Sequence, residues 1–142
     1  MKQISVNGLN LIKSFEGCRL KAYKALSTEK FYTIGYGHYG ADVLPNLRIT
    51  QYQAELLLLK DLTRFCAAVN KYDHKYKWTQ NEFDALVSFA YNIGNIDQLT
   101  AKGARTKTQI ADKIPAYCKS GKKTIPGLVR RRTAERALFL KR

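Results

Sequence analysis

The chain has little cysteine, no long apolar run and few acids, and each shortage excludes a class of protein. Its three cysteines, Cys18, Cys66 and Cys118, are odd in number and widely spaced, which fits neither a disulfide framework nor a zinc ribbon. We expect them to be reduced, mostly buried side chains in a protein made in the cytoplasm. The apolar runs Leu56–Leu59 and 65–69 are far shorter than the roughly 18 residues that a membrane-spanning helix requires.

The shortage of acids leaves the chain strongly basic. Asp and Glu total 11 against 25 Lys and Arg, which gives a formal net charge of +14. A surface this basic attracts a polyanion, whether nucleic acid, an anionic membrane or an anionic cell-wall polymer, and charge alone does not distinguish them. The first residues, Met1 to Ser5, lack the apolar core of a secretory signal. A length of 142 residues with 45% hydrophobic composition predicts one globular domain with a single core.

Apolar spacing predicts a mostly helical chain with one small β segment near its start. Apolar residues recur every three positions from Val6 to Phe15, which predicts a helix that Gly17 ends. Alternation then predicts two short strands and a following loop, at residues 20–23, 31–36 and 39–47.

Two capping boxes mark later helix starts. Thr50 with Gln53 and Thr79 with Glu82 have the required spacing. The second of these helices, which ends at Gly94, carries so continuous an apolar stripe that we expect it to be the central core helix. The remaining expectations are a helix from Thr50 to about 69, a solvated basic connection over 70–77, a helix over about 106–114, a basic turn at 120–123 and a helix over 126–140.

Residues 14–40 concentrate groups that could handle a polar polymer. Glu16 ends the first helix, and Thr33 and His38 follow in a glycine-rich β segment, where glycine permits close backbone approach. The helix dipole disfavours an anion at this end, so a half-buried Glu16 carboxyl would keep its proton, as a general acid must. The alternative is a solvated glutamate paired with Arg19 or Lys21, in a helix and hairpin without a catalytic role.

The pair Glu16-Gly17 followed by the run Thr33-Ile34-Gly35-Tyr36-Gly37-His38 is a specific pattern. It resembles the phage-type lysozymes, the endolysins and muramidases of glycoside hydrolase family 24. The resemblance covers most of the chain and is weakest over residues 96–119. Its further motifs, in order, are Leu20, Ala22-Tyr23, Ile49-Thr50, Ala54-Glu55, Asp61, Asn81 to Leu86, Asn92-Ile93-Gly94 and Pro126 to Glu135.

The resemblance implies an α+β fold, mostly α. It is a lysozyme-like single catalytic domain over residues 1–142, with a small β-hairpin lobe (about 18–48) and a helical lobe joined by a long helix. The active-site cleft would lie between the lobes. The implied activity is hydrolysis of the β-1,4 bond between N-acetylmuramic acid and N-acetylglucosamine in bacterial peptidoglycan, which lyses the host. The charge of +14 would suit an anionic cell-wall surface.

The resemblance also assigns roles to particular residues. It implies Glu16 as the general acid, Thr33 beside the attacking water, and an ion pair between His38 and Asp61 that raises the pKa of His38. Arg131 is expected to reach Glu16 or the wall peptide, and the other arginines of its run are expected to be surface charge. The implied substrate-binding residues are Tyr36, Gly37, His38, Tyr91, Asn92 and Arg131.

One departure from the family pattern leaves the reaction open. The family carries an aspartate, or in some members a cysteine, at the position that is Ala25 here, and glycoside hydrolysis normally uses two carboxyls. Glu29, on a connection about two residues longer than usual, could supply the missing carboxylate, and we prefer this interpretation. Alternatively Thr33 alone positions the water while Glu16 acts as acid and then base. The third possibility is a lytic transglycosylase, in which the muramoyl 6-hydroxyl attacks.

Two non-enzymatic classes compete with this interpretation. A nucleic-acid-binding module would share the charge but shows no binding motif here, so nucleic acid is not expected as a partner. A basic wall-binding or membrane-disrupting protein is the other, since the last helix is cationic. No metal or other cofactor is expected, because no cluster of His, Cys and acids has ligand spacing. We expect the protein to stay in the host cytoplasm until a separate pore-forming holin gives access to the wall.

Overall fold

The chain forms two compact units in the computed structural model, which describes residues 1–142. One unit is residues 13–63, and the other combines residues 1–12 with 64–142. None of the helices has the length and apolar character needed to cross a membrane. The elements are α1 (Val6–Glu16), β1 (Arg19–Tyr23), β2 (Tyr32–Gly35), β3 (His38–Gly40), α2 (Gln51–Asn70), α3 (Asp73–Tyr76), α4 (Gln80–Ile93), α5 (Lys107–Lys113), the 3-10 helix η1 (Ile114–Ala116), β4 (Lys119–Ser120), β5 (Lys123–Thr124) and α6 (Pro126–Leu140).

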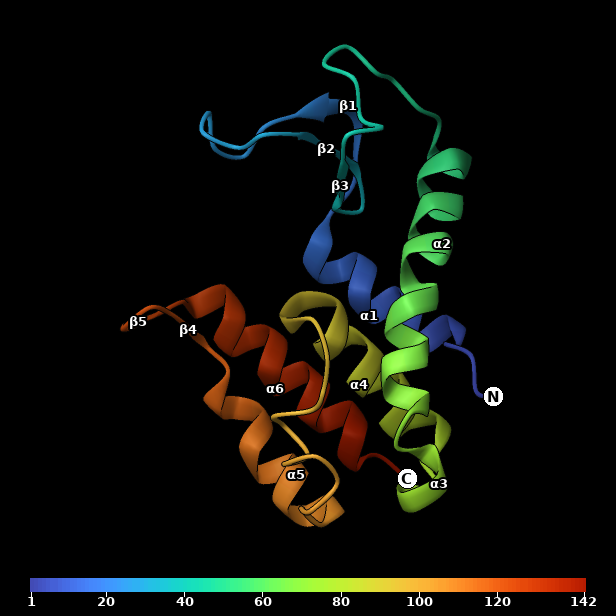
Figure 1. Ribbon diagram of the computed structural model, residues 1–142, viewed down its shortest axis with the longest axis vertical. Helices are drawn as coiled ribbons and strands as arrows, with labels where there is room; N and C mark the ends of the chain where they lie inside the picture. Colours follow the sequence, from blue (N-terminus) through green and yellow to red (C-terminus); the bar gives the residue numbers. More distant parts are fainter. The chain divides into compact units, whose positions relative to one another are not determined.

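The unit of residues 13–63 is built on a three-stranded antiparallel sheet in the order β1-β2-β3 (Figure 1). The first two strands agree with the sequence prediction, but β3 lies where the predicted loop was to begin. The chain reverses because Gly35 and Gly37 adopt φ of +66° and +92°, a region that favours glycine. This turn pairs Ile34 with His38. The sheet's small core consists of Ala22, Ile34 and Val43, with Tyr32, Leu47, Ile49 and Leu57 packed against it.

The start of α2 belongs to the same unit and confirms the first capping box. The Gln53 backbone N–H donates to Thr50 Oγ1 at 3.1 Å, and the Thr50 N–H donates to Gln53 Oε1 at 2.8 Å. These bonds satisfy donors that have no partner within the helix.

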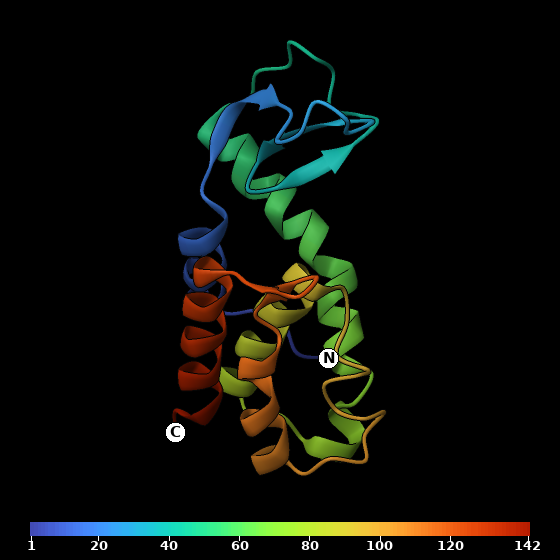
Figure 2. The same cartoon turned by 90° about the vertical axis from the view of Figure 1, so that its left-hand side faces the viewer.

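The unit of residues 1–12 and 64–142 is organised around α4. Every residue from Phe83 to Ala90 is buried, and α6 packs along this helix (Figure 2). The second capping box is present, with the Glu82 N–H donating to Thr79 Oγ1 at 3.1 Å. The expectation of a central core helix is therefore confirmed, because continuous apolar sequence can be satisfied only by contact on all sides.

The segment 70–77 is not the solvated loop that its basic residues suggested. It contains α3, and Tyr72 and Tyr76 are buried. Tyr76 stacks on Trp78 with ring centroids 4.4 Å apart, and the Trp78 indole N–H donates to the Val69 carbonyl at 3.1 Å. The prediction was wrong because it weighed the lysines, whereas aromatic burial decides where this backbone lies.

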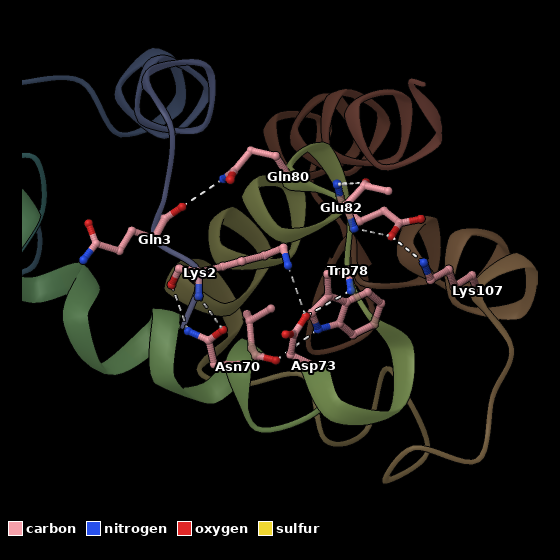
Figure 3. Close-up of polar contacts among 10 residues, drawn as sticks. Lys2, Gln3, Asn70, Asp73, Trp78, Gln80, Glu82 and Lys107 are labelled. Atoms are coloured by element: carbon pink, nitrogen blue, oxygen red, sulfur yellow. Dashed lines mark hydrogen bonds and ion pairs between the residues drawn. The ribbon is translucent and has the colours of Figure 1, made fainter.

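The first residues of the chain are held against α2 and α4 by hydrogen bonds (Figure 3). The Lys2 N–H donates to Asn70 Oδ1 at 3.2 Å, and Asn70 Nδ2 donates back to the Lys2 carbonyl at 2.9 Å. Gln80 Nε2 donates to the Gln3 carbonyl at 2.8 Å. This two-sided pairing fixes the segment that leads into α1.

The predicted turn at 120–123 is present, whereas the cysteines are less buried than predicted. The basic turn at 120–123 connects β4 and β5, which pair as a two-stranded antiparallel sheet. The cysteines are all free, as expected, but Cys18 is exposed, and Cys66 and Cys118 are only half-buried. Burial raises the pKa of the Cys66 thiol, which keeps it in the protonated form.

We predict that Gly8→Ala destabilises the protein, although glycine-to-alanine changes inside helices normally stabilise by about 1 kcal/mol. A Cβ at Gly8 would lie 2.6 Å from Ile4 Cγ1 and 2.8 Å from the buried Asp84 side chain. Overpacking of this kind costs about 1–3 kcal/mol, so urea unfolding should show a net loss. Asn7→Ala, at an exposed position of the same helix, is the control and should not destabilise. A gain in stability for Gly8→Ala would contradict the packing described here.

Candidate active site

Glu16 lies at the carboxyl end of α1, and its side chain is half-buried. Gly17 ends the helix with φ +68°, and its N–H donates to the Lys13 carbonyl at 3.1 Å. The lysine of this last turn forms an ion pair with Glu55 on α2. Glu16 therefore occupies the helix end that disfavours an anion.

Thr33 lies on the middle strand of the sheet in the same unit. It is half-buried and pairs with Tyr23 on β1 and with Tyr39 on β3. Strand β1 begins three residues after Glu16, and its first residue, Arg19, pairs with Gly35. A single strand therefore connects the helix that carries the carboxyl to the strand that carries the hydroxyl.

Glu29 makes a local hydrogen bond within its connecting segment. Its Oε1 accepts the Leu26 N–H at 2.9 Å, while its own N–H donates to the Leu26 carbonyl at 3.0 Å. Ala25 is exposed beside them. Any movement of the Glu29 carboxylate toward a substrate would first have to break its bond to Leu26.

His38 is bracketed by two carboxylates, although the sequence suggested one. Its Nδ1 lies 2.7 Å from Asp61 Oδ2, the expected contact, and its Nε2 lies 2.9 Å from Asp42 Oδ2. Burial lowers the pKa of His38, but the hydrogen bonds to Asp42 and Asp61 outweigh it, and the net pKa is raised. The hydrogen bond from His38 lowers the pKa of Asp42. Sequence reasoning missed Asp42, since no motif marks an acid in a loop that folds back onto a strand.

These contacts attach the β3 side of the sheet to α2. Asp61 belongs to α2, and Gln51, at the start of that helix, donates from Nε2 to the Tyr36 hydroxyl at 2.7 Å. Tyr36 is buried, and the Lys13 ammonium lies 5.7 Å from its ring centroid. The run Tyr36-Gly37-His38 is therefore held at both ends by α2.

The other expected site residues belong to the unit of residues 1–12 and 64–142. Tyr91 is half-buried, with its ring edge-to-face against Phe65 at 5.3 Å, and Asn92 next to it is exposed. Arg131 is buried and donates from Nη2 to the Ser88 carbonyl at 3.1 Å. The expected contact between Arg131 and Glu16 joins residues of different units and stays a prediction.

The chain carries the family's sequence over nearly its whole length. The family described as phage lysozyme matches residues 13–135. The chain belongs to the phage lysozyme family. It is 54% identical over 144 residues to the endolysin of Bacillus phage PZA, in an alignment that covers 96% of this chain and 55% of that protein. The chain thus spans about half the length of the first curated relatives it matches.

Solved structures show the same fold. The muramidase domain of SpmX from Asticaccaulis excentricus has a TM-score of 0.86 at 35% identity, covering 100% of both chains. The endolysin from Escherichia coli O157:H7 phage FAHEc1 has a TM-score of 0.81 at 38% identity, covering 99% of this chain and 94% of that one. The predicted fold, a mostly α-helical α+β lysozyme, is therefore confirmed.

One expectation about this phage lysozyme's arginine run was wrong. Arg130 is exposed as expected, but Arg132 is only 1% exposed and its Nε lies 2.8 Å from Oε1 of the fully buried Glu135. Burial raises the pKa of Glu135, and the two arginines and Ser88 oppose that rise. Helical spacing of three and four residues brings Glu135 beside both Arg132 and Arg131, and that spacing was the available signal for burial.

No group of three or more His, Cys, Asp or Glu side chains in the chain could hold a metal ion. The predicted site residues carry carboxyl, hydroxyl, amide, imidazole and guanidinium groups. Such groups can transfer protons and hold a glycan by hydrogen bonds.

We predict that His38→Gln loses more stability at about pH 5.5 than at about pH 8.5. The folded-state pKa of His38 is raised above its ordinary value of about 6.5. Its stabilisation is therefore fully present below that value and is lost as the pH rises through the folded-state pKa. Urea unfolding of wild type and variant at both pH values measures this. His74→Gln, at an exposed position, is the control, and an equal loss for His38→Gln at both pH values would contradict the ion-pair interpretation.

Proposed function

We propose that the protein is an endolysin with muramidase activity. It would hydrolyse the β-1,4 bond between N-acetylmuramic acid and N-acetylglucosamine in peptidoglycan. The observation that carries the proposal is Glu16 at the end of α1, one strand away from Thr33, within the matched family region. The endolysin relatives and the muramidase-domain structure support it, and they do not favour a non-enzymatic wall-binding or nucleic-acid-binding protein.

In the proposed reaction Glu16 is the general acid. Its proton passes to the glycosidic oxygen as that oxygen leaves the muramic acid anomeric carbon. A water beside the Thr33 hydroxyl adds to that carbon, and a second carboxylate takes the proton that this water loses. The place of Glu16 supports this role, because it is half-buried at the carboxyl end of α1 and one strand connects it to the sheet that carries Thr33.

The second carboxylate cannot come from the family's usual position, which is Ala25 here. We propose that Glu29 supplies it after leaving its bond to Leu26, which is a single exposed hydrogen bond and therefore inexpensive to break. The alternatives are a water positioned by Thr33 alone, or attack by the muramoyl 6-hydroxyl as in a lytic transglycosylase.

The finer parts of the function are also proposals. The glycan would be contacted by Tyr36, Gly37, His38, Tyr91, Asn92 and Arg131, within a single catalytic domain of residues 1–142. Stacking of Tyr91 on a sugar and hydrogen bonding of its acetamide by Asn92 are the natural roles. We propose that the protein waits in the host cytoplasm and reaches the anionic wall through a separate holin.

We predict that Glu16→Gln clears a suspension of purified, lipid-free peptidoglycan about 10²–10⁴ times more slowly than wild type, because a positioned proton donor is lost. Asp112→Asn is the matched control, since Asp112 is an exposed acid in a loose ion pair with Arg136 at 3.5 Å. Its rate should equal the wild-type rate. A Glu16→Gln protein that clears as fast as wild type would make the enzymatic assignment wrong.

We predict reducing muramic acid ends among the released fragments, and a clearing rate for Glu29→Gln at least about tenfold below wild type. Mass spectrometry of the fragments measures the first and turbidity the second. Anhydro ends would instead establish transglycosylation. Reducing ends combined with an unchanged Glu29→Gln rate would leave the water to Thr33.

A further inference from the structure

A buried cation lies directly beneath an exposed amide at the end of α4. Arg132 donates from Nη2 to Asn92 Oδ1 at 2.8 Å, while its Nε lies 2.8 Å from Glu135 Oε1. Its guanidinium carbon lies 4.9 Å from the centroid of the Phe89 ring. The side chain thus spans from a fully buried carboxylate to a residue on the surface.

The cluster around Glu135 contains more positive charge than it needs for pairing. Glu135 Oε2 already accepts from Ser88 Oγ at 2.6 Å and from Arg131 Nε at 3.2 Å. Arg132 adds a second guanidinium, and its Nη1 has no hydrogen-bond partner. Burying an extra cation with an unpaired donor is costly, so pairing with Glu135 alone does not explain why an arginine lies here.

The contact with Arg132 allows only one orientation of the Asn92 carboxamide. A guanidinium has donors and no acceptor, so it can face only the oxygen of the Asn92 carboxamide. The Asn92 amide nitrogen must then point away from Arg132, toward the solvent to which this residue is exposed. The arginine therefore fixes which end of the amide a ligand meets.

We propose that Arg132 is a positioning residue that holds the Asn92 carboxamide with its N–H donors outward, where they bind the carbonyl oxygen of a substrate acetamide group. Every sugar of the glycan strand carries such an acetamide. The proposal rests on the proposed function, in which Asn92 contacts the glycan. It gives the buried guanidinium a task that its pairing with Glu135 does not supply.

The decisive comparison is between Asn92→Asp and Asn92→Ala. Aspartate at this position keeps an oxygen for Arg132 and forms a charge-assisted contact, but it has no N–H to donate. We expect Asn92→Asp to be as stable as wild type in urea, yet to clear limiting peptidoglycan about tenfold more slowly, as Asn92→Ala does. If the contact only joins α4 to α6, Asn92→Asp should keep the wild-type rate, and that result would overturn the proposal.

Arg132 is tested in a double-mutant cycle with Asn92→Ala. Arg132→Lys keeps the buried charge, but one ammonium cannot reproduce the planar contact to both partners. We expect it to lower the rate severalfold in the wild-type background and to add no further loss when Asn92 is already alanine. Losses that multiply in the double variant would overturn the proposal. If Arg132→Lys still contacts Asn92, Arg132→Met takes its place in the same double-mutant cycle.

Arg136→Met is the matched control for a lost arginine on α6, because its Nε donates to the Ala111 carbonyl at 3.1 Å, away from Asn92. It should change stability without changing the clearing rate. The wild-type rate set against Glu16→Gln tests the proposed function, whereas only the Asn92 and Arg132 variants test this inference. A wild-type rate for both Asn92 variants would overturn the inference alone.

Discussion

The imidazole of His38, held between two carboxylates, is the interaction on which the candidate site's β segment depends. A three-stranded sheet with so small a core gains little from hydrophobic burial. The contacts from His38 to Asp61 and from Tyr36 to Gln51 attach its last turn to the long α2 helix. Since Thr33 lies on the strand just before that turn, these contacts also restrain the hydroxyl proposed to hold the water.

The unit of residues 1–12 and 64–142 is subject to a different constraint, because it buries charged side chains. Its central helix α4 is closed off by apolar contacts, yet Ser88 lies within it and faces Glu135. An isolated buried carboxylate would be strongly disfavoured, and here two guanidinium groups neutralise it. The same groups extend toward the end of α4, where Asn92 and Tyr91 reach the surface region. One cluster therefore neutralises the buried carboxylate and also contacts a polar side chain at the end of α4.

Much of the fold could be predicted from the sequence because its signals are local. The capping boxes at Thr50 and Thr79, the stripe of α4 and the glycine after Glu16 each act within one turn of a helix. Strand β3 depends on pairing with β2, and the burial of Tyr76 depends on Trp78. Both are tertiary contacts that periodicity does not contain.

The residues of the candidate site also divide into those with a local sequence signal and those that depend on tertiary contacts. Glu16 and Thr33 are predicted from a specific motif and stay predictions, whereas Asp42 was missed and Arg132 was misjudged. Asp42 reaches His38 only because the loop after β3 folds back. Arg132 was taken for surface charge because a run of arginines is usually solvated, and only its spacing from Glu135 opposed that interpretation.

The two hydrogen bonds between Lys2 and Asn70 have a consequence for the order in which the chain folds. These bonds join residues 68 positions apart. The unit that they close consists of the twelve residues that precede residues 13–63 in the chain and of the residues that follow them. Closing so long a loop is entropically unfavourable until distant partners are available. During synthesis residues 1–12 emerge first, but the contiguous residues 13–63 could collapse before them, while the opening segment stays without its partners until α2 and α4 have left the ribosome.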